Sequence, residues 1–203
     1  MTTDTARDQK HQRAMAKQKS AVDAGIAAAT EERGVAVLLT GDGKGKTSSA
    51  FGMVLRALGY GQQVAVIQFI KGVQLSGEEM YLRDQCPQVR FYQMGTGFTW
   101  DTQDRQADIA AAQTTWEVAR EALQDESIDL VVLDEITYML AFDYLLEAEV
   151  LAAIQERPNQ QSVVVTGRGG GSALRDIMDT VSEVKEIKHA YRAGVSARRG
   201  VDY

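Results

Sequence analysis

The stretch from residue 35 to residue 58 constrains the fold more than any other part of this sequence. An apolar run over 35–39 leads directly into the loop TGDGKGKTS (40–48), and a helix-patterned segment over 47–58 follows. A strand, a glycine-rich loop and a helix in this order form the context that a phosphate-binding loop requires. We therefore expect a P-loop at 40–48. A glycine-rich turn that binds no ligand is the alternative interpretation.

The residue types in this loop suit phosphate chemistry. Its three glycines allow backbone conformations and close approaches that a Cβ would block, so that successive N–H groups converge on phosphate oxygens. The following helix adds its positive N-terminal end. Lys44 and Lys46 supply charge, and the Thr47 hydroxyl is placed to hold a divalent cation that bridges the phosphates. The predicted nucleotide-binding residues of the loop are Gly41, Asp42, Gly43, Lys44, Gly45, Lys46, Thr47 and Ser48.

The spacing of the loop departs from the usual pattern. In G-x-x-x-x-G-K-[ST] the first glycine would fall at position 40, where this chain has Thr40, and the first glycine is Gly41 instead. The cradle is therefore one residue shorter than the standard loop. We expect it to be tighter than the cradle of an ordinary ATPase.

Short β-branched runs alternate with longer helix-patterned stretches from residue 34 onward. This alternation predicts βαβ units, and runs nearly continuous in apolar residues are typical of strands covered on both faces. The predicted fold is α/β, with a mostly parallel sheet of five or six strands and helices on both faces. Predicted strands cover 35–39, 64–69, 89–92, 130–133, 162–166 and 184–187; predicted helices cover 47–58, 104–123 and 143–155; loops cover 94–103 and 167–172.

Length and composition limit how many domains the chain can form. Its 203 residues, 44% hydrophobic and 25% charged, suffice for one compact domain. Residues 1–33 are polar and cannot build a core of their own. We expect an N-terminal arm there, either solvated or partly helical and docked on the body or on a second subunit, and a P-loop domain over 34–203.

Charge and cysteine content exclude several classes of protein. The formal net charge of -6 argues against a general nucleic-acid binder. The single cysteine, Cys86, rules out an internal disulfide framework, which fits a reducing compartment. No leader sequence is evident, and no apolar stretch approaches the roughly 18 residues that span a bilayer. We therefore expect a cytoplasmic protein without nucleic-acid or membrane partners.

Two adjacent carboxylates follow another buried strand. The run LVVL is followed by Asp134 and Glu135, and the carboxyl ends of strands are where open α/β sheets bind ligands. Such a pair can hold Mg²⁺ directly or through water, and Asp134, Glu135 and Thr47 are the predicted metal site. Two alternatives stay open: Glu135 activates a water as in an ATPase, or the acids stabilise the N-terminus of the next helix.

Four segments of the chain resemble the ATP:corrinoid adenosyltransferases of the BtuR, CobO or CobA type. They are TGDGKGKTSSAFGMVLRALGYGQQVAVIQFIKG (40–72), MGTGFTWDTQDRQADIAAA (94–112), DLVVLDEITYMLAFDYL (129–145), and VVVTGRG (163–169) with VKEIKHAYRAGVSARRGVDY (184–203). The short cradle is also the form found in that family. The resemblance implies a RecA-like P-loop fold, usually dimeric.

The resemblance also implies a reaction. The 5′-deoxyadenosyl group of ATP moves to the cobalt(I) of a corrinoid and triphosphate leaves, in cobalamin biosynthesis or salvage. The nucleotide would lie reversed relative to ordinary P-loop ATPases, with the cradle on its terminal phosphate. Lys44, Lys46 and Mg²⁺ or Mn²⁺ would stabilise charge on the departing triphosphate, and no general base is needed. A homodimer and an electron donor such as a flavoprotein or reduced flavin are the implied partners.

Further site residues come from the same resemblance. Phe98 and Trp100 look like the family's aromatic residues that press on the lower face of the corrinoid and displace its axial ligand. A small core beneath their loop is the alternative. Arg56 and Arg168 are candidate phosphate or ribose contacts. For His189 we expect a structural hydrogen bond.

Two other functions fit the same motifs. A RecA-like P-loop ATPase needs only the cradle and the acid pair. An ATP-dependent corrinoid carrier would bind both ligands without forming a cobalt–carbon bond. Detection of that bond separates the three hypotheses.

Overall fold

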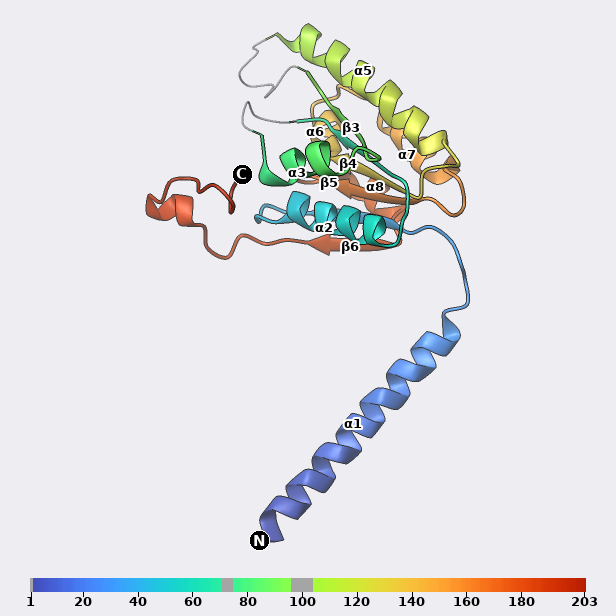
Figure 1. The fold of residues 1–203 in the computed structure, drawn as a ribbon, viewed down its shortest axis with the longest axis vertical. Helices are drawn as coiled ribbons and strands as arrows, with labels where there is room; N and C mark the ends of the chain where they lie inside the picture. The colour runs from blue at the N-terminus through green and yellow to red at the C-terminus, as the bar shows by residue number, and fades with distance from the viewer. Residues whose placement is uncertain (1, 71–74, 96–103) are drawn as a thin grey trace. The chain divides into compact units, whose positions relative to one another are not determined.

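A computed structural model gives the structure of residues 2–70, 75–95 and 104–203, with side-chain surroundings described from residue 7 onward. The chain divides into two compact units, residues 1–32 and 33–203. Figure 1 shows the elements of each unit along the chain. Phe98 and Trp100 lie outside the described residues, so their predicted role is not addressed by the structure.

The first unit is a single helix, α1 (Thr2–Ala28). It extends well beyond the alanine-rich stretch over 20–30, because alanine, glutamine, lysine and arginine fill most of it and all favour helix. An i,i+4 ion pair between Lys19 and Asp23 adds local support. Its larger apolar side chains are spaced by seven and four residues along the helix and therefore share one face. Met15, Val22 and Ile26 are all exposed.

The second unit is built on a parallel sheet. Its six described strands follow the order β3-β2-β4-β5-β1-β6, and every pairing is parallel. This confirms the predicted α/β fold with a parallel sheet of five or six strands. Five strands lie within one residue of their predicted bounds at either end. The strands are β1 (Ala36–Thr40), β2 (Val64–Gln68), β3 (Arg90–Gln93), β4 (Leu130–Asp134), β5 (Ser162–Thr166) and β6 (Thr180–Glu183).

The sixth strand is where the prediction was wrong. The strand predicted over 184–187 lies instead at Thr180–Glu183, and all four of its residues are exposed. An edge strand pairs with one neighbour only, so it does not need the apolar run by which buried strands are recognised. Val184 follows β6 and donates its N–H to Thr40 O at 2.7 Å. The chain therefore continues from the sheet edge toward the loop after β1.

Helices cover both faces of the sheet. Each buried strand sends alternate side chains to opposite faces; in β4, Val131 and Leu133 pack with Trp116 of α5, whereas Val132 packs with Phe51 of α2. Figure 1 shows α5 and α2 on opposite sides of the strands. The described helices of this unit are α2 (Lys46–Gly59), α3 (Gly77–Gln85), α5 (Arg105–Gln124), α6 (Ile136–Ala141), α7 (Glu147–Glu156), α8 (Gly171–Asp176) and the 3₁₀ helix η1 (Ala190–Ala193).

Two helix bounds differ from the prediction. The helix predicted over 143–155 begins only at Glu147, because Asp143 has a positive φ of 54° that interrupts helical geometry. The loop predicted over 167–172 ends at Gly170, and α8 begins at Gly171. The helix predicted over 104–123 is α5, and Asp104 caps it by accepting hydrogen bonds from Gln106 N and Ala107 N.

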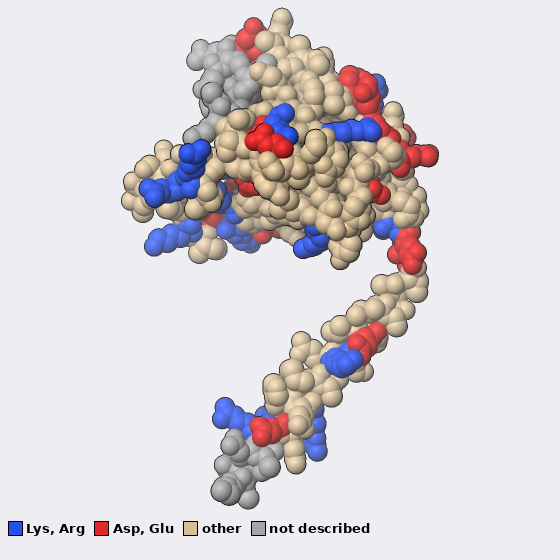
Figure 2. Space-filling view, in the orientation of Figure 1, with Lys and Arg blue, Asp and Glu red and all other residues tan. Residues whose placement is uncertain are grey.

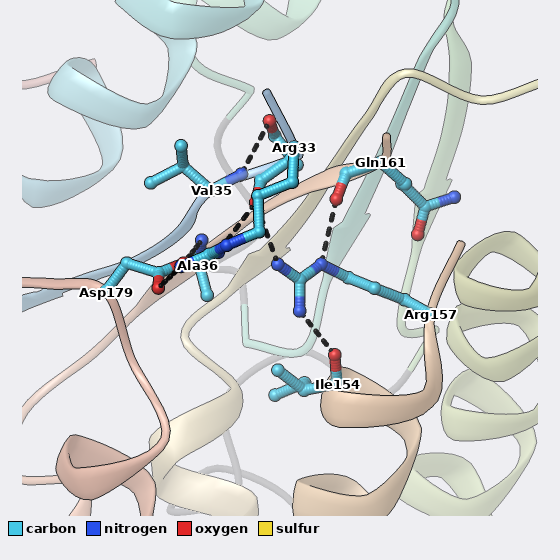
Figure 3. Close-up of polar contacts among 9 residues, drawn as sticks. Arg33, Val35, Ala36, Ile154, Arg157, Gln161 and Asp179 are labelled. Carbon is cyan, nitrogen blue, oxygen red and sulfur yellow. Dashed lines mark hydrogen bonds and ion pairs between the residues drawn. The ribbon is translucent and has the colours of Figure 1, made fainter. Parts of the chain in front are cut away.

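A polar cluster ties the edge strand to β1 at the amino end of the sheet (Figure 3). Arg33 donates to both carboxylate oxygens of Asp179, at 2.9 and 2.6 Å, and Ala36 N–H donates to the same carboxylate at 2.8 Å. These hydrogen bonds hold the pKa of Asp179 at about 2. Nearby, Arg157 donates to the carbonyl oxygens of Ile154 and Gln161. The cluster fixes β1 at the end opposite its glycine-rich loop.

The surface of the second unit carries charges of both signs. In the view of Figure 2 they are interspersed, so a phosphate ligand must find positive charge in a local site. Among the helices that the structure describes, none is long and apolar enough to cross a membrane.

Candidate active site

A cavity of about 840 Å³ lies at the carboxyl end of the sheet, where β1, β2 and β4 terminate. Its size is that of a typical small-molecule site. Residues 42–48, Asp134, Glu135 and Arg168 line it. The structure therefore brings together most of the site residues predicted from sequence. Ser76 and Glu78 add to one wall, and residues from the C-terminal segment, including Glu186 and Asp202, form another.

Lys46 opens helix α2 at the base of the cavity. It is only 7% exposed, and its Nζ donates to Gly43 O at 3.1 Å within the loop. Burial lowers the pKa of Lys46 below its usual value, while the nearby negative charge of Glu135 works in the opposite direction. A buried cation beside the N-terminus of α2 is a strong local attractor for an anionic ligand.

Gly41 and Gly43 have a packing role that the sequence did not reveal. A Cβ on Gly41 would lie 2.4 Å from Val184 O, and a Cβ on Gly43 would lie 2.8 Å from Val184 O and from Lys185 C. Gly43 N–H also donates to Val184 O at 2.8 Å. Gly45 has a φ of 119° and open space where a Cβ would lie, and Gly41 also has a positive φ, of 98°. Gly41 and Gly43 therefore admit the C-terminal segment, and Gly41 and Gly45 adopt backbone conformations that favour glycine.

Lys44 points toward the C-terminal segment as well as lining the cavity. Its Nζ lies 3.3 Å from Asp202 Oδ1, and both side chains are partly exposed. The hydrogen bond from Arg198 N–H, assisted by Lys44, lowers the pKa of Asp202. In this structure Lys44 therefore already has a carboxylate partner at the cavity wall.

Asp134 is held by three hydrogen-bond donors. The carboxylate is 2% exposed, and its Oδ1 accepts from Thr47 Oγ1 at 3.0 Å and from Thr166 Oγ1 at 2.7 Å. Its Oδ2 accepts from Gln68 Nε2 at 2.9 Å. A carboxylate so engaged is anionic and fixed in direction. Because Thr47 gives its proton to Asp134, the lone pairs of the Thr47 hydroxyl are left for another partner.

Glu135 adopts a strained backbone conformation beside Asp134. Its φ of 60° is in the left-handed region, and its N–H donates to Thr166 Oγ1 at 2.9 Å. Burial raises the pKa of Glu135 to about 7, and the charge of Asp134 adds to the shift. Glu135 is the N-cap residue of α6 but makes no capping hydrogen bond through its side chain. Glu135 therefore stands at the N-terminus of α6 without capping it through a side-chain hydrogen bond.

The residues around Asp134 fit a divalent cation. Glu135 Oε2 is buried and has no hydrogen-bond partner in the described part of the chain, and the Thr47 hydroxyl donates to the neighbouring carboxylate of Asp134. Within the same residues no cluster of three or more His, Cys, Asp or Glu side chains could enclose a metal. One hydroxyl and one or two carboxylates, completed by ligand phosphates and water, is the set that Mg²⁺ uses at nucleotide sites.

Two threonines position the loop that carries Arg168. Thr137 Oγ1 donates to Arg168 O at 2.9 Å, and Thr40 Oγ1 donates to Gly169 O at 2.7 Å. A Cβ on Gly167 would lie 1.9 Å from Thr137 Oγ1, so this approach requires glycine. Arg168 is exposed at the cavity wall, close enough for its charge to lower the pKa of Glu135 and of Lys46.

Comparison with known proteins adds to this geometry. Residues 32–203 match the protein family described as ATP:corrinoid adenosyltransferase BtuR/CobO/CobP. The corrinoid adenosyltransferase of Escherichia coli K12 is 48% identical over 196 residues, which cover 97% of this chain and 99% of that protein. The corrinoid adenosyltransferase of Pseudomonas aeruginosa is 49% identical over 203 residues, 100% of both chains.

The chain belongs to the ATP:corrinoid adenosyltransferase family. It is therefore an enzyme, a transferase whose substrates are ATP and a corrinoid. The family assignment covers the whole second unit, and the relatives align with the first unit as well.

Arg56 lies apart from the cavity of this adenosyltransferase, and His189 lines it. Arg56 is exposed in the last turn of α2, ten residues after Lys46, which is about 15 Å along the helix axis. It does not line the cavity. His189 lines the cavity, and its Nδ1 accepts a hydrogen bond from Tyr191 N at 3.1 Å at the start of η1. The expected structural hydrogen bond of His189 is thereby confirmed.

The adenosyltransferase site also contains residues that motif reading missed. Each of four strands ends in a buried polar residue at the cavity edge of the sheet: Thr40 in β1, Gln68 in β2, Asp134 in β4 and Thr166 in β5. Only Asp134 was singled out from sequence. The shared signal is a polar residue at the last position of an otherwise apolar strand, which is costly to bury without a partner.

Proposed function

We propose that this chain transfers the 5′-deoxyadenosyl group of ATP to the cobalt(I) of a reduced corrinoid, with triphosphate as the leaving group. The observation that carries the proposal is the single cavity shared by Lys46, Glu135 and the N-terminus of α2. The electron pair of cobalt(I) attacks the 5′ carbon, and the carbon–oxygen bond to the triphosphate breaks. No proton is transferred in this step.

The residues of the short cradle stabilise the leaving group. Negative charge grows on the departing triphosphate, and groups that bind this charge more strongly in the transition state accelerate the reaction. Lys46 is buried and is the first residue of α2, so its charge lies at the same helix end as the N–H groups that point out of the first turn. Lys44 adds a second positive charge once a phosphate competes with Asp202 for it. We infer that the terminal phosphate binds here, as the family resemblance implies.

A divalent cation, Mg²⁺ or Mn²⁺, completes the phosphate site in this proposal. Thr47 Oγ1 and Glu135 would hold it, and Asp134 would orient Thr47 and accept hydrogen bonds from bound water. When bound, the cation neutralises phosphate charge. This assignment also accounts for Glu135 without a hydrolytic role. Adenosyl transfer needs no general base, so the ATPase alternative is not favoured.

The remaining parts of the proposal rest on the family resemblance. Phe98 and Trp100 would press on the corrinoid and favour the cobalt state that is easier to reduce. A flavoprotein or reduced flavin would donate the electron. We propose a homodimer that acts in the cytoplasm, with Arg168 as a phosphate or ribose contact. Residues 1–33 are proposed as an arm separate from the catalytic domain over 34–203.

The test is an anaerobic assay with ATP, Mg²⁺ and chemically reduced corrinoid. Formation of a cobalt–carbon bond changes the absorption spectrum of the corrinoid and makes the product light-sensitive. We expect both changes, and neither when ATP is omitted. A corrinoid that binds but shows no light-sensitive product would favour the carrier alternative instead.

A further inference from the structure

Gln68, the last residue of β2, contains a buried hydrogen-bond acceptor that the fold does not use. The side chain is 3% exposed and lines the cavity. Its Nε2 donates to Asp134 Oδ2 at 2.9 Å, the residue opposite it in the register of β2 and β4. Its Oε1 is buried and has no hydrogen-bond partner among the described residues. A buried acceptor without a donor carries a desolvation cost that an apolar side chain of similar shape would avoid.

The orientation of this amide is fixed by its neighbour. Turning the amide over would place Oε1 against Asp134 Oδ2, and two acceptors without a proton between them repel. Asp134 is anionic and already accepts from Thr47 and Thr166, so the NH₂ group of Gln68 must face it. The carbonyl oxygen of Gln68 therefore has to find its donor elsewhere.

A second unused acceptor belongs to Glu135, the residue after Asp134, which lines the same cavity. Glu135 Oε2 is also buried without a hydrogen-bond partner in the described part of the chain. Gln68, Glu135, Asp134 and Thr47 all line the same cavity. Two buried acceptors in one cavity wall, neither with a donor among the described residues, point to a ligand that brings positive charge and hydrogen-bond donors together.

We propose that Gln68 is a positioning residue of the cation site, and that its Oε1 accepts a hydrogen bond from a water bound to the divalent cation that accompanies ATP. Mg²⁺ keeps several of its waters when it binds to nucleotide sites, and these waters are strong donors. Hydrogen-bond partners of such waters orient the ion without touching it. This inference rests on the proposed function, because the cation enters with the nucleotide.

Gln161 provides a matched control in the same chain. It is 1% exposed, and its Oε1 is likewise buried without a hydrogen-bond partner among the described residues. Its Nε2, however, donates to the carbonyl oxygens of Ala122, Asp125 and Ile128 at 3.1 to 3.2 Å. Gln161 lies beside Arg157 at the opposite end of the strands (Figure 3) and does not line the cavity. Its amide therefore binds backbone carbonyl groups away from the cavity, whereas the amide of Gln68 binds Asp134 in the cavity wall.

The variants Gln68→Met and Gln161→Met test the proposal by calorimetric titration with ATP at graded Mg²⁺ concentrations. Loss of an outer hydrogen-bond partner of a metal site typically weakens metal affinity by about 10- to 100-fold. We expect Gln68→Met to raise the half-saturating Mg²⁺ concentration roughly 10-fold and Gln161→Met to leave it within about twofold. ATP binding in the presence of EDTA should be the same in Gln68→Met and wild type. Equal losses with Mg²⁺ and with EDTA would mean that Gln68 acts only on the protein, and would overturn the proposal.

If Gln68→Met does not fold, NMR spectroscopy of the wild-type chain tests the same proposal. In protein labelled with ¹³C-glutamine, the side-chain carbonyl resonance of Gln68 should shift when Mg²⁺ is added to the ATP-saturated protein, and that of Gln161 should not. An unmoved Gln68 carbonyl would refute the inference even if adenosylcorrinoid forms normally. Failure to form adenosylcorrinoid would instead count against the proposed function, so the two failures are distinguishable.

Discussion

Replacing Gly43 by alanine tests how the P-loop is supported. The φ of Gly43 lies outside the positive region reserved for glycine, so the alanine backbone is permitted. The obstacle is steric, because the new Cβ would lie 2.8 Å from Val184 O and from Lys185 C, which are both backbone atoms. Overpacking of this kind costs about 1–3 kcal/mol, and weakening the Gly43–Val184 hydrogen bond adds about 0.5–1.5 kcal/mol. We expect a total loss of about 2–4 kcal/mol.

Urea unfolding measures this loss, with Gly52→Ala as the matched control. Gly52 lies within α2 with no atom near its Cβ position, so alanine there should stabilise the protein by about 0.5–1 kcal/mol. With an m-value of about 2 kcal/mol/M, Gly43→Ala should lower the urea midpoint by about 1–2 M. Its affinity for ATP should fall as well. A Gly43→Ala protein that matches Gly52→Ala in stability and ATP affinity would refute the packing of residues 184–185 on the loop.

Three further changes have expected outcomes. Lys46→Met should lower the adenosyl-transfer rate by about 10²–10³-fold through loss of charge at the leaving group; near-normal turnover of a folded variant would contradict the cradle assignment. Thr166→Val removes a donor to Asp134 and the partner of Glu135 N–H, so the Mg²⁺ requirement should rise roughly 10-fold in a titration. Because the folded pKa of Asp179, about 2, lies below its ordinary value, its stabilising effect should be present above pH 4 and lost as the pH falls toward 2. In urea unfolding, Asp179→Asn should thus cost about 1 kcal/mol at pH 7, a value reduced by solvent exposure, and progressively less in acid.

The fold was predictable from sequence where burial imposes a pattern. Four strands, β1, β2, β4 and β5, lie inside the sheet and are buried, and their continuous apolar runs follow from that environment. The position of β6 was not predicted correctly, because its residues are exposed at the sheet edge and carry no apolar run. Helix α1 was underestimated because it depends on local propensity alone, which alanine-rich stretches show more plainly than mixed polar ones.

The site was predictable where its residues are neighbours in sequence. The loop over 40–48 and the pair Asp134 and Glu135 are local motifs with a chemical rationale of their own. The partners of Asp134 come from three other strands or helices, and only the strand order brings Gln68 and Thr166 to it. The same holds for the contact of Lys44 with Asp202, which lie more than 150 residues apart in the chain.

The glycines of the loop illustrate a different limit. A glycine-rich pattern indicates that backbone must approach something closely, but it does not say what. At Gly41 and Gly43 the approaching group is the backbone at Val184 and Lys185 of the same chain. Only the tertiary structure separates this packing role from the phosphate role expected of Gly45.

The bond that breaks in ATP tests the central claim most directly. Adenosyl transfer cleaves the 5′ carbon–oxygen bond and leaves the three phosphates joined, whereas hydrolysis cleaves a bond to phosphorus and leaves ADP. Chromatography of the quenched anaerobic reaction separates tripolyphosphate, ADP and orthophosphate. We expect tripolyphosphate in step with light-sensitive adenosylcorrinoid, and little ADP when the corrinoid is omitted. Stoichiometric ADP and orthophosphate without adenosylcorrinoid would contradict the proposed reaction and identify the chain as an ATPase.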